Sequence, residues 1–482
     1  RTLHFIDESY GPAITLVDDA LDADGNRALS EQWRNEGAPT KWEIGGDYSK
    51  NLGAFGALKT LFVFNKENSN INKLFSKGQG SSEFQYKTQN SILSRSESII
   101  RSSLSKGIGD GQSLEIGGEA ALNKFNRSFQ STGRSVATDP LLITNDDAVK
   151  IKENRYEIFA IHNYTISSKM SLTSSLTGEF SKISSVTVPL TGANVERSKK
   201  FSFLKPRVDF RYDLTGSDQL RASIEKKVSQ LDFQNFVATF DVNNDILRLG
   251  NTGIVPEKSW NYSVAYEHRL PNDAGALQVE FFYRDISDYI ELVDFTDFFD
   301  VDGNAIARAD LDPISVSGNI PSARSYGIKT TGNLRLGFVG VPEAVISIEH
   351  VWDDSEVTDQ FSGLKRRFKW KSDHEFKFNF RHDVTEWGLS YGFKGTIKSE
   401  SGRHDIDEVA RTDQGDLYEA FAEVRIWDHM RLIFKFEHIT PLKYTTDLDF
   451  YNDHIRYNDL DRRERRNWNY VKEYSVFLQG TF

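Results

Sequence analysis

The chain has 482 residues, a formal net charge of −11 and no cysteine. Disulfides and thiolate metal sites are therefore excluded, and the acidic balance argues against a general nucleic-acid binder, which needs clustered Lys and Arg. Mean hydropathy is −0.50, and no run approaches the roughly 18 apolar residues of a membrane helix. A membrane β-barrel escapes this test because only every second residue of a strand meets lipid.

Apolar and polar residues alternate in long runs along the chain. From Met170 to Phe180 the even positions are mostly apolar and the odd positions polar, which predicts a strand with one face of each kind. No run shows the helical period, so the sequence predicts an all-β chain. We expect strands with this alternation at 2–8, 155–166, 204–214, 376–384, 387–397, 418–426, 432–436 and 468–482, and the weakest alternation lies in the serine-rich region 80–106.

The predicted connections alternate between short turns and long polar segments, which is the asymmetry of outer-membrane barrels with short periplasmic turns and long extracellular loops. Eight short and nine long connections predict 18 strands. The short turns are expected near 53–56, 107–111, 167–168, 215–218, 271–275, 337–343, 385–386 and 427–429. The long connections are expected near 10–39, 67–93, 126–152, 183–200, 231–256, 293–321, 355–370, 401–414 and 441–467.

Strand length and aromatic placement separate a membrane barrel from a soluble β-sandwich or a surface adhesin. Strands in soluble domains average about five or six residues, whereas a tilted membrane strand needs roughly 9–11. Aromatic residues near both ends of the strands predict the girdles of a lipid–water interface. They are Trp42, Tyr156, Trp260, Tyr326, Trp352, Tyr418 and Trp468 near the long loops, and Trp387 and Trp427 near the short turns.

The final strand ends on an aromatic residue preceded by alternate apolar positions: Tyr474, Val476, Leu478, Gly480 and Phe482. This pattern resembles the assembly signal of outer-membrane proteins, which the barrel assembly machinery reads. An exposed strand edge is able to pair with another sheet before the barrel closes. The alternative is an ordinary last strand that ends in Phe.

Local motifs resemble one family of barrels. Lys205-Pro206 begins a strand, Leu220-Arg221 begins the next, and Gly250-Asn251 and Val255-Pro256-Glu257 follow. This order, with a "fyr.i.D.i"-like segment at 281–288 and the segment 117–123, resembles the barrels of TonB-dependent receptors. Ser263 departs from the Glu usual in the family. The resemblance covers about residues 40–482.

The resemblance implies a bacterial outer-membrane receptor that takes up a scarce small-molecule ligand, such as a siderophore, a metal chelate or another nutrient. Uptake would be driven from the inner membrane by a TonB-type energy transducer acting through a plug. We expect residues 1–482 to form one transmembrane antiparallel β-barrel domain. Its 18 strands would belong to a barrel of about 22, with the plug and first strands preceding Arg1. The alternative is a passive porin-like channel, complete with 18 strands.

Several polar clusters are candidate sites, although the ligand-binding residues are not identified by the sequence. Calcium in extracellular loops would suit the carboxylate–amide spacing of Asp300, Asp302 and Asn304 and of the similar segment 22–26, but Asp-Gly also favours a tight turn. His404, Asp405 and Asp407 form a metal-like cluster whose alternative is a solvated acidic loop that includes Glu408.

The run Arg462, Arg463, Arg465 and Arg466 lies just before the final strand. Guanidinium groups suit phosphate oxygens, so contact with lipopolysaccharide and outer-membrane lipid is one interpretation. The other is a charged rim paired with Asp459, Asp461 and Glu464. No nucleophile elbow, phosphate loop or His-Glu-x-x-His motif occurs, so the sequence does not predict an enzyme, and an outer-membrane hydrolase is the disfavoured alternative.

Overall fold

The computed structural model describes residues 2–480 except 10–13, 22–26, 38, 80–81, 135, 137, 189–192, 237–238, 242–245, 249, 252, 300–302, 428 and 471. The described chain is almost entirely strand and turn, and the helices in it are single 3-10 turns. No described helix is long and apolar enough to cross a membrane. The chain forms two compact units. The first unit comprises Arg1–Tyr164, Ser174–Pro206 and Asp232–Thr252, and the second comprises Thr165–Thr173, Arg207–Leu231 and Gly253–Phe482.

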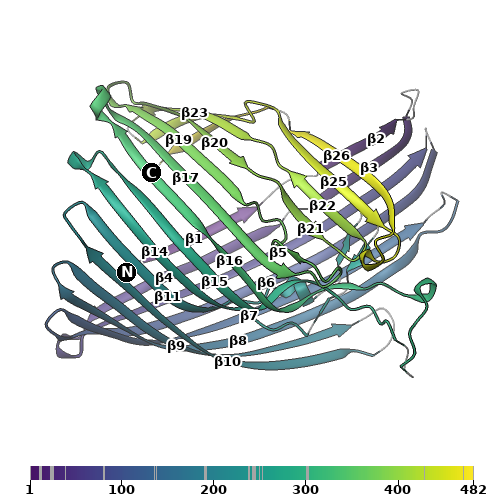
Figure 1. The fold of residues 1–482 in the computed structure, drawn as a ribbon, viewed down its shortest axis with the longest axis horizontal. Coiled ribbons are helices and arrows are strands. Elements are labelled where there is room, and N and C mark those ends of the chain that lie inside the picture. Colours follow the sequence, from purple (N-terminus) through teal and green to yellow (C-terminus); the bar gives the residue numbers. More distant parts are fainter. Residues whose placement is uncertain are drawn as a thin grey trace. The chain divides into compact units, whose positions relative to one another are not determined.

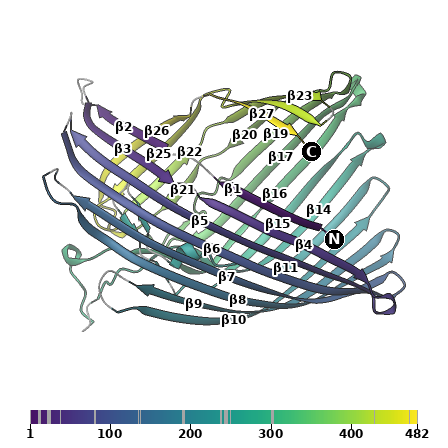
Figure 2. The ribbon, with the colours of Figure 1, turned by 180° about the vertical axis from the view of Figure 1, so that it is seen from behind.

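The first unit is a ladder of long antiparallel strands (Figure 2). β1 pairs with β4, β2 with β3, and both β3 and β4 pair with β5, which is followed by β6, β7 and β8. The strands are β1 (Thr2–Ser9), β2 (Ile14–Leu21), β3 (Arg27–Gly37), β4 (Thr40–Asn51), β5 (Ala57–Gln79), β6 (Ser82–Gly109), β7 (Gln112–Arg134), β8 (Leu142–Ser167), β9 (Met170–Val188) and β10 (Val195–Asp213). Between β11 (Asp218–Val228) and β14 (Lys258–Leu270) lie the 3-10 turn η2 (Phe233–Phe236) and the small hairpin β12 (Thr239–Asp241) and β13 (Ile246–Arg248).

The second unit shows the same up-and-down pattern, with each long strand hydrogen-bonded to the next long strand of the same sheet along the chain (Figure 1). Its strands are β11 (Asp218–Val228), β14 (Lys258–Leu270), β15 (Gly275–Asp294), β16 (Ser315–Leu336), β17 (Val341–Thr358), β19 (His374–Val384), β20 (Leu389–Lys398), β23 (Leu417–Trp427), β24 (Met430–Glu437) and β27 (Glu473–Gly480). The short β18 (Lys365–Arg366) pairs with β17. A separate sheet joins β21 (Ser401–His404), β22 (Glu408–Asp413), β25 (Leu442–Tyr451) and β26 (Leu460–Tyr470).

The predicted strand number is confirmed, whereas the predicted extent of the strands is wrong. Among the described residues, the largest sheet has 21 strands. It has 18 when β1 and β2 are counted as one interrupted strand, β3 and β4 as another, and the two-residue β18 is left out. The expected loops at 67–93, 126–152 and 183–200 are mostly strand, and 10–39 contains β2 and β3. The serine-rich region is also strand, since β6 runs to Gly109. These segments contain few apolar residues, and no run in them alternates over the length of a strand, so the sequence pattern does not mark them.

Two predicted loops and the final strand need the same correction. Segments 401–414 and 441–467 contain the hairpins of the separate sheet. The run 468–482 was expected to be one strand, but Trp468 belongs to β26, and β27 begins at Glu473. The loops 231–256, 293–321 and 355–370 are long connections as predicted.

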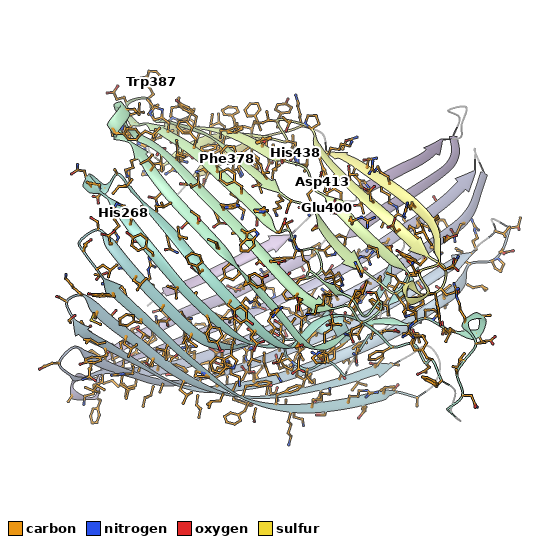
Figure 3. The ribbon with its side chains drawn as sticks, in the orientation of Figure 1. His268, Phe378, Trp387, Glu400, Asp413 and His438 are labelled. Atoms are coloured by element: carbon orange, nitrogen blue, oxygen red, sulfur yellow. The ribbon has the colours of Figure 1, made fainter. Side chains whose placement is uncertain are left out.

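The eight predicted short turns all fall between consecutive strands. Gly340 and Gly388 end two of them with positive φ angles of 84° and 58°, a conformation that glycine adopts without a Cβ clash. Large side chains at these turns are strongly exposed: Phe55, Phe338, Trp387 and Trp427 are between 65% and 75% accessible. Figure 3 shows Trp387 at the tip of the hairpin between β19 and β20. Such rings match the aromatic girdle expected at one interface.

Candidate functional site

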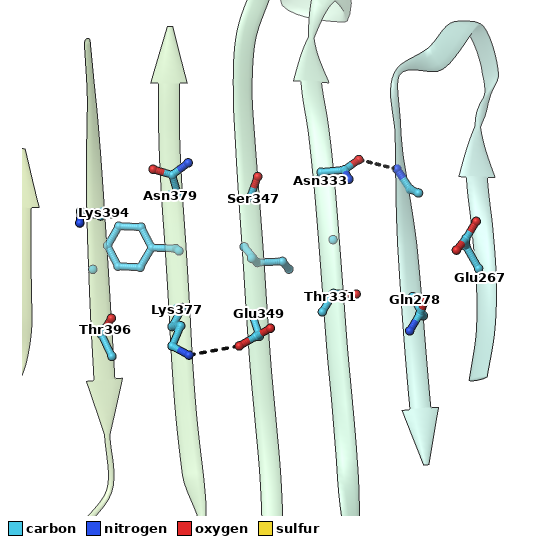
Figure 4. Close-up of a pocket in the computed structure, with 15 residues that line it drawn as sticks. Glu267, Gln278, Thr331, Asn333, Ser347, Glu349, Lys377, Asn379, Lys394 and Thr396 are labelled. Atoms are coloured by element: carbon cyan, nitrogen blue, oxygen red, sulfur yellow. Dashed lines mark hydrogen bonds and ion pairs between the residues drawn. The ribbon is translucent and has the colours of Figure 1, made fainter. Parts of the chain in front are cut away.

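The polar face of the second unit is hollowed across β14 to β20. The hollow has a volume of about 580 Å³. The register places its lining side chains opposite one another, since Gln278 pairs with Thr331, Thr331 with Glu349, and Glu349 with Lys377. Figure 4 shows this row of side chains, which continues on β20 with Lys394 and Thr396.

The charges on this wall compensate one another. Glu349 accepts ion pairs from Lys329 at 2.7 Å and from Lys377 at 3.2 Å. Lys394 pairs with Glu419 at 2.6 Å. The wall holds amides, hydroxyls and paired charges, a chemistry that suits a hydrated contact surface.

The opposite face of the same strands is apolar. Phe378 lies next to Lys377 in the chain but packs with Phe393 and Tyr418. The distances between the ring centroids are 5.6 Å to Phe393 and 6.4 Å to Tyr418. The alternation predicted for 204–214 is also confirmed at Val208 and Arg207, because Val208 pairs with Ile224 and Arg207 with Glu225. A sheet with one charged and one aliphatic and aromatic face has the pattern of a membrane barrel wall.

The first unit also carries a polar face with ion pairs between strands. Lys205 binds Glu157 at 2.8 Å and Glu179 at 2.7 Å, so it bridges two carboxylates on neighbouring strands. Buried Arg155 lies 3.5 Å from Glu119. The lysine of the Lys205-Pro206 motif therefore has a structural role that the sequence alone did not reveal.

At the long-loop end of β15 to β17, the second unit has its own packed core. Ile286, Val316, Ile320 and Val357 are buried together with Phe368. A second cluster joins Leu292 to residues from three further connections: Phe361, Ile406, Val409 and Ile455. The long connections of this unit are therefore folded against one another rather than solvated separately.

A buried ion network lies within this loop core. Asp359 is fully buried and accepts hydrogen bonds from His404 Nδ1 at 2.9 Å and Ser362 Oγ at 2.6 Å. Arg366 lies 3.4 Å from Asp359 and donates to Glu291 at 2.6 Å. Burial by itself would raise the pKa of Asp359, but the bonds from His404 and Ser362 and the Arg366 charge outweigh it and lower the pKa to about 2.

Two further contacts tie the tip of the β25–β26 hairpin to the loop after β15. His454 is fully buried, and its Nε2 lies 2.8 Å from Asp294 Oδ2. Burial would raise the pKa of Asp294, but the hydrogen bonds from His454 and Thr296 outweigh it and lower the pKa. Arg308 donates to Asp459 at 2.6 Å and Asp453 at 3.2 Å.

Residues 5–365 match the family described as "TonB dependent receptor-like, beta-barrel". The chain belongs to this family of TonB-dependent receptors. It is therefore part of a receptor of a class that resides in the outer membrane, and its strands are those of the family's transmembrane β-barrel. The family consists of receptors and transporters rather than enzymes.

Solved structures of TonB-dependent receptors share the fold at low sequence identity. The copper transporter OprC is 11% identical with a TM-score of 0.59, covering 100% of this chain and 80% of that protein. The unliganded ferric citrate transporter FecA is 12% identical with a TM-score of 0.56, covering 97% and 69%. The siderophore receptor PiuA from Acinetobacter baumannii is 10% identical with a TM-score of 0.55, covering 92% and 78%. A search of curated protein sequences found no match.

In this receptor barrel, the predicted assembly residues lie on β27. Tyr474, Val476 and Leu478 share one face, are exposed, and stand opposite Phe436, Phe434 and Leu432 of β24. Gly480 ends the strand. Phe482 lies outside the described residues, so the role of these residues as an assembly signal stays a prediction.

The four predicted arginines all lie on β26 and have acidic partners. Arg462 binds Asp461 and Glu464 at 2.8 Å each, and Arg466 binds Glu464 at 2.8 Å. Arg465 binds Asp447 at 2.6 Å and Arg463 binds Asp449 at 3.2 Å. The charged-rim interpretation is correct for Asp461 and Glu464 but wrong for Asp459, which pairs with Arg308.

The proposed metal ligands do not converge within the described part of the chain, which contains no group of three or more His, Asp or Glu placed to hold an ion. His404 binds Asp359, whereas Asp405 binds Arg403 at 2.9 Å. The alternative of a solvated acidic loop is wrong, because Asp405 and Glu408 are fully buried. Tyr451 N donates to the Asp407 carbonyl at 2.8 Å. Asp300, Asp302 and the segment 22–26 lie outside the described residues, which retain only Asn304 of the first calcium motif.

Sequence reasoning missed the polar wall as a site and the whole loop network. Asp294 and His454 are 160 residues apart in the chain, so no local motif could join them. Arg308 had no distinguishing neighbour in the sequence. The sequence held one indication of the polar wall. The alternation of polar and apolar residues in their strands places both Glu349 and Lys377 on the polar face.

Proposed function

We propose that this barrel serves an outer-membrane receptor that imports a scarce ligand, such as a siderophore, a metal chelate or another small nutrient. The family match carries this proposal. It is supported by a polar wall with paired charges, which suits an aqueous lumen, and by long loops that fold into a core of their own. The iron and copper transporters of the same fold motivate the ligand class.

Import would depend on a plug within the barrel that reaches a TonB-type transducer at the inner membrane. The plug and further strands before Arg1 stay predictions. The test is uptake of radiolabelled iron chelates, copper, haem and cobalamin by cells that express the full receptor, with and without the transducer. Accumulation that requires both the receptor and the transducer is expected for one ligand. Equal, non-saturating entry without the transducer would contradict the proposal and favour a passive channel.

Two surface partners belong to the same proposal. The guanidinium groups of Arg463 and Arg465 are exposed. Phosphate groups of lipopolysaccharide would bind them in competition with the carboxylates of Asp449 and Asp447. The apolar face of β27 would engage the assembly machinery. Calcium near Asn304 is a weaker proposal, and isothermal titration of the purified receptor with Ca²⁺ would test it.

A further inference from the structure

A second cavity lies in the first unit, on the face of β5, β6 and β7 that η2 covers. Its volume is about 250 Å³. The register sets Lys73 opposite Gln89, and Leu93 opposite Arg127, so these lining residues share one face of the sheet. The cavity therefore belongs to the wall of the long-loop half of these strands.

The roof of the cavity is an ordered turn. Phe233 packs edge-on against Phe125 at 6.0 Å and against Phe236 at 6.1 Å. The Asp232 carboxylate accepts a hydrogen bond from Gln234 N at 2.9 Å and fixes the start of the turn. Gln234 lines the cavity from this side, so the space is enclosed by sheet below and by η2 above.

The lining combines positive charge with aromatic surface. Lys73 and Arg127 both line the cavity, and none of the described residues that line it is acidic. Arg127 donates through Nε to Ser91 Oγ at 3.1 Å, and its guanidinium lies 5.1 Å from the Phe129 ring centroid. Two cations beside aromatic rings favour an anion that carries an apolar part.

A buried amide donor adds an independent observation. Gln89 is only 5% exposed, and its Nε2 has no hydrogen-bond partner among the described residues. Buried donors are nearly always satisfied in folded proteins. Since Gln89 lines the cavity, an acceptor bound there would satisfy it.

We propose that this cavity binds an anionic, ring-bearing arm of the imported ligand. Its carboxylate would lie between Lys73 and Arg127 and accept a hydrogen bond from Gln89, with the ring against Phe125 and Phe129. Cavities for whole ligands span roughly 300–1,000 Å³, so about 250 Å³ suits one arm rather than a complete chelate. The inference rests on the proposed import function for its choice of occupant.

The test uses the full receptor in detergent and benzoate as the probe, with binding followed by saturation-transfer NMR titration. Benzyl alcohol has the ring without the carboxylate, and acetate has the carboxylate without the ring, so the two serve as controls. Benzoate should bind at least tenfold more tightly than either control. Arg127→Met, and Gln89→Glu, which replaces the donor by a like charge at nearly equal size, should each weaken benzoate at least fivefold. Lys124→Met, on the opposite face of β7, should leave binding unchanged.

Heat-modifiable mobility of each variant checks that the barrel is folded, and Arg127→Lys should retain most of the binding. Equal benzoate affinity in the wild type, Arg127→Met and Gln89→Glu would overturn the proposal, as would equal affinity for benzyl alcohol. The transport assay is separate. Variant-sensitive benzoate binding in a receptor without transducer-dependent uptake would uphold the cavity and reject the import function, whereas uptake without such binding would do the reverse.

Discussion

Lys205 shows how one residue can hold several strands of the receptor barrel together. It bridges Glu157 and Glu179, and all three side chains are largely buried. Removing one member of a buried ion group leaves uncompensated charge, which costs about 3–5 kcal/mol. We expect Lys205→Met to lower the free energy of unfolding by about 3 kcal/mol in urea titrations of the receptor in lipid vesicles.

Arg465→Met is the matched control for Lys205→Met because its ion pair with Asp447 is exposed. Exposed pairs contribute about 0–1 kcal/mol. Adding Glu179→Gln to Lys205→Met should restore part of the loss by removing one of the two stranded carboxylates. A loss no larger than that of Arg465→Met would show that the bridge is not stabilising.

Asp359 predicts an acid-sensitive loop core. Its pKa is lowered to about 2, whereas an unfolded Asp titrates near about 3.9. A lowered pKa stabilises the folded loop above the unfolded value, and this contribution, roughly 2–3 kcal/mol, is lost as pH falls from about 4 to about 2. Hydrogen exchange of amides 359–368, corrected for the intrinsic pH effect, should become faster across this window.

Asp359→Asn is the control for the acid effect, because it removes the titrating group while keeping a similar shape. The variant should exchange faster than the wild type at pH about 7 and show little further change in the acid range. An unchanged wild-type exchange profile between about pH 4 and 2 would contradict the assignment of Asp359 as the responsible carboxyl.

At the scale of the strand, alternate residues have opposite environments. Val208 lies on the apolar face and Arg207 on the polar face of β10. Arg at a mid-membrane lipid position costs about 2–4 kcal/mol, so Val208→Arg should lower the free energy of unfolding in vesicles by that amount. Arg207→Leu should have a smaller effect because this face does not meet lipid. A larger loss of unfolding free energy in Arg207→Leu than in Val208→Arg would instead place lipid on the face of Arg207.

The elements that the sequence predicts well are those whose physics is local. The turns at Gly340 and Gly388 require residues that tolerate positive φ, and strands such as β19 alternate because one face meets lipid. β2 and β3 escaped prediction because their apolar residues do not keep to one parity: Leu16 and Val17 are adjacent in β2, and Ala28 and Leu29 are adjacent in β3. The loop network escaped for another reason: Asp359, His404 and Arg366 meet only through tertiary packing, and no spacing in the chain encodes that meeting.

At the scale of the whole molecule, the terminal strand should govern insertion into the membrane. Leu478→Asp places a charge on the exposed apolar face of β27, and deletion of Phe482 removes the terminal aromatic residue. Both changes should reduce the amount of heat-modifiable barrel in the outer membrane while leaving synthesis intact. Gln479→Asp, at the opposite parity, is the control. Normal yields from Leu478→Asp and the Phe482 deletion would contradict the assembly signal.

The length of the central strands has a consequence for what other organisms encounter at the cell surface. β6 contains 28 residues, whereas roughly 9–11 suffice to cross the hydrocarbon. The remaining roughly 18 residues, at about 3.3 Å per residue and a tilt of about 45°, extend the sheet roughly 40 Å beyond the hydrocarbon. Bacteriophages and antibodies would therefore bind to rigid extended strands that stand among the surface sugars. Mutations that abolish such binding should cluster at the outer ends of these strands.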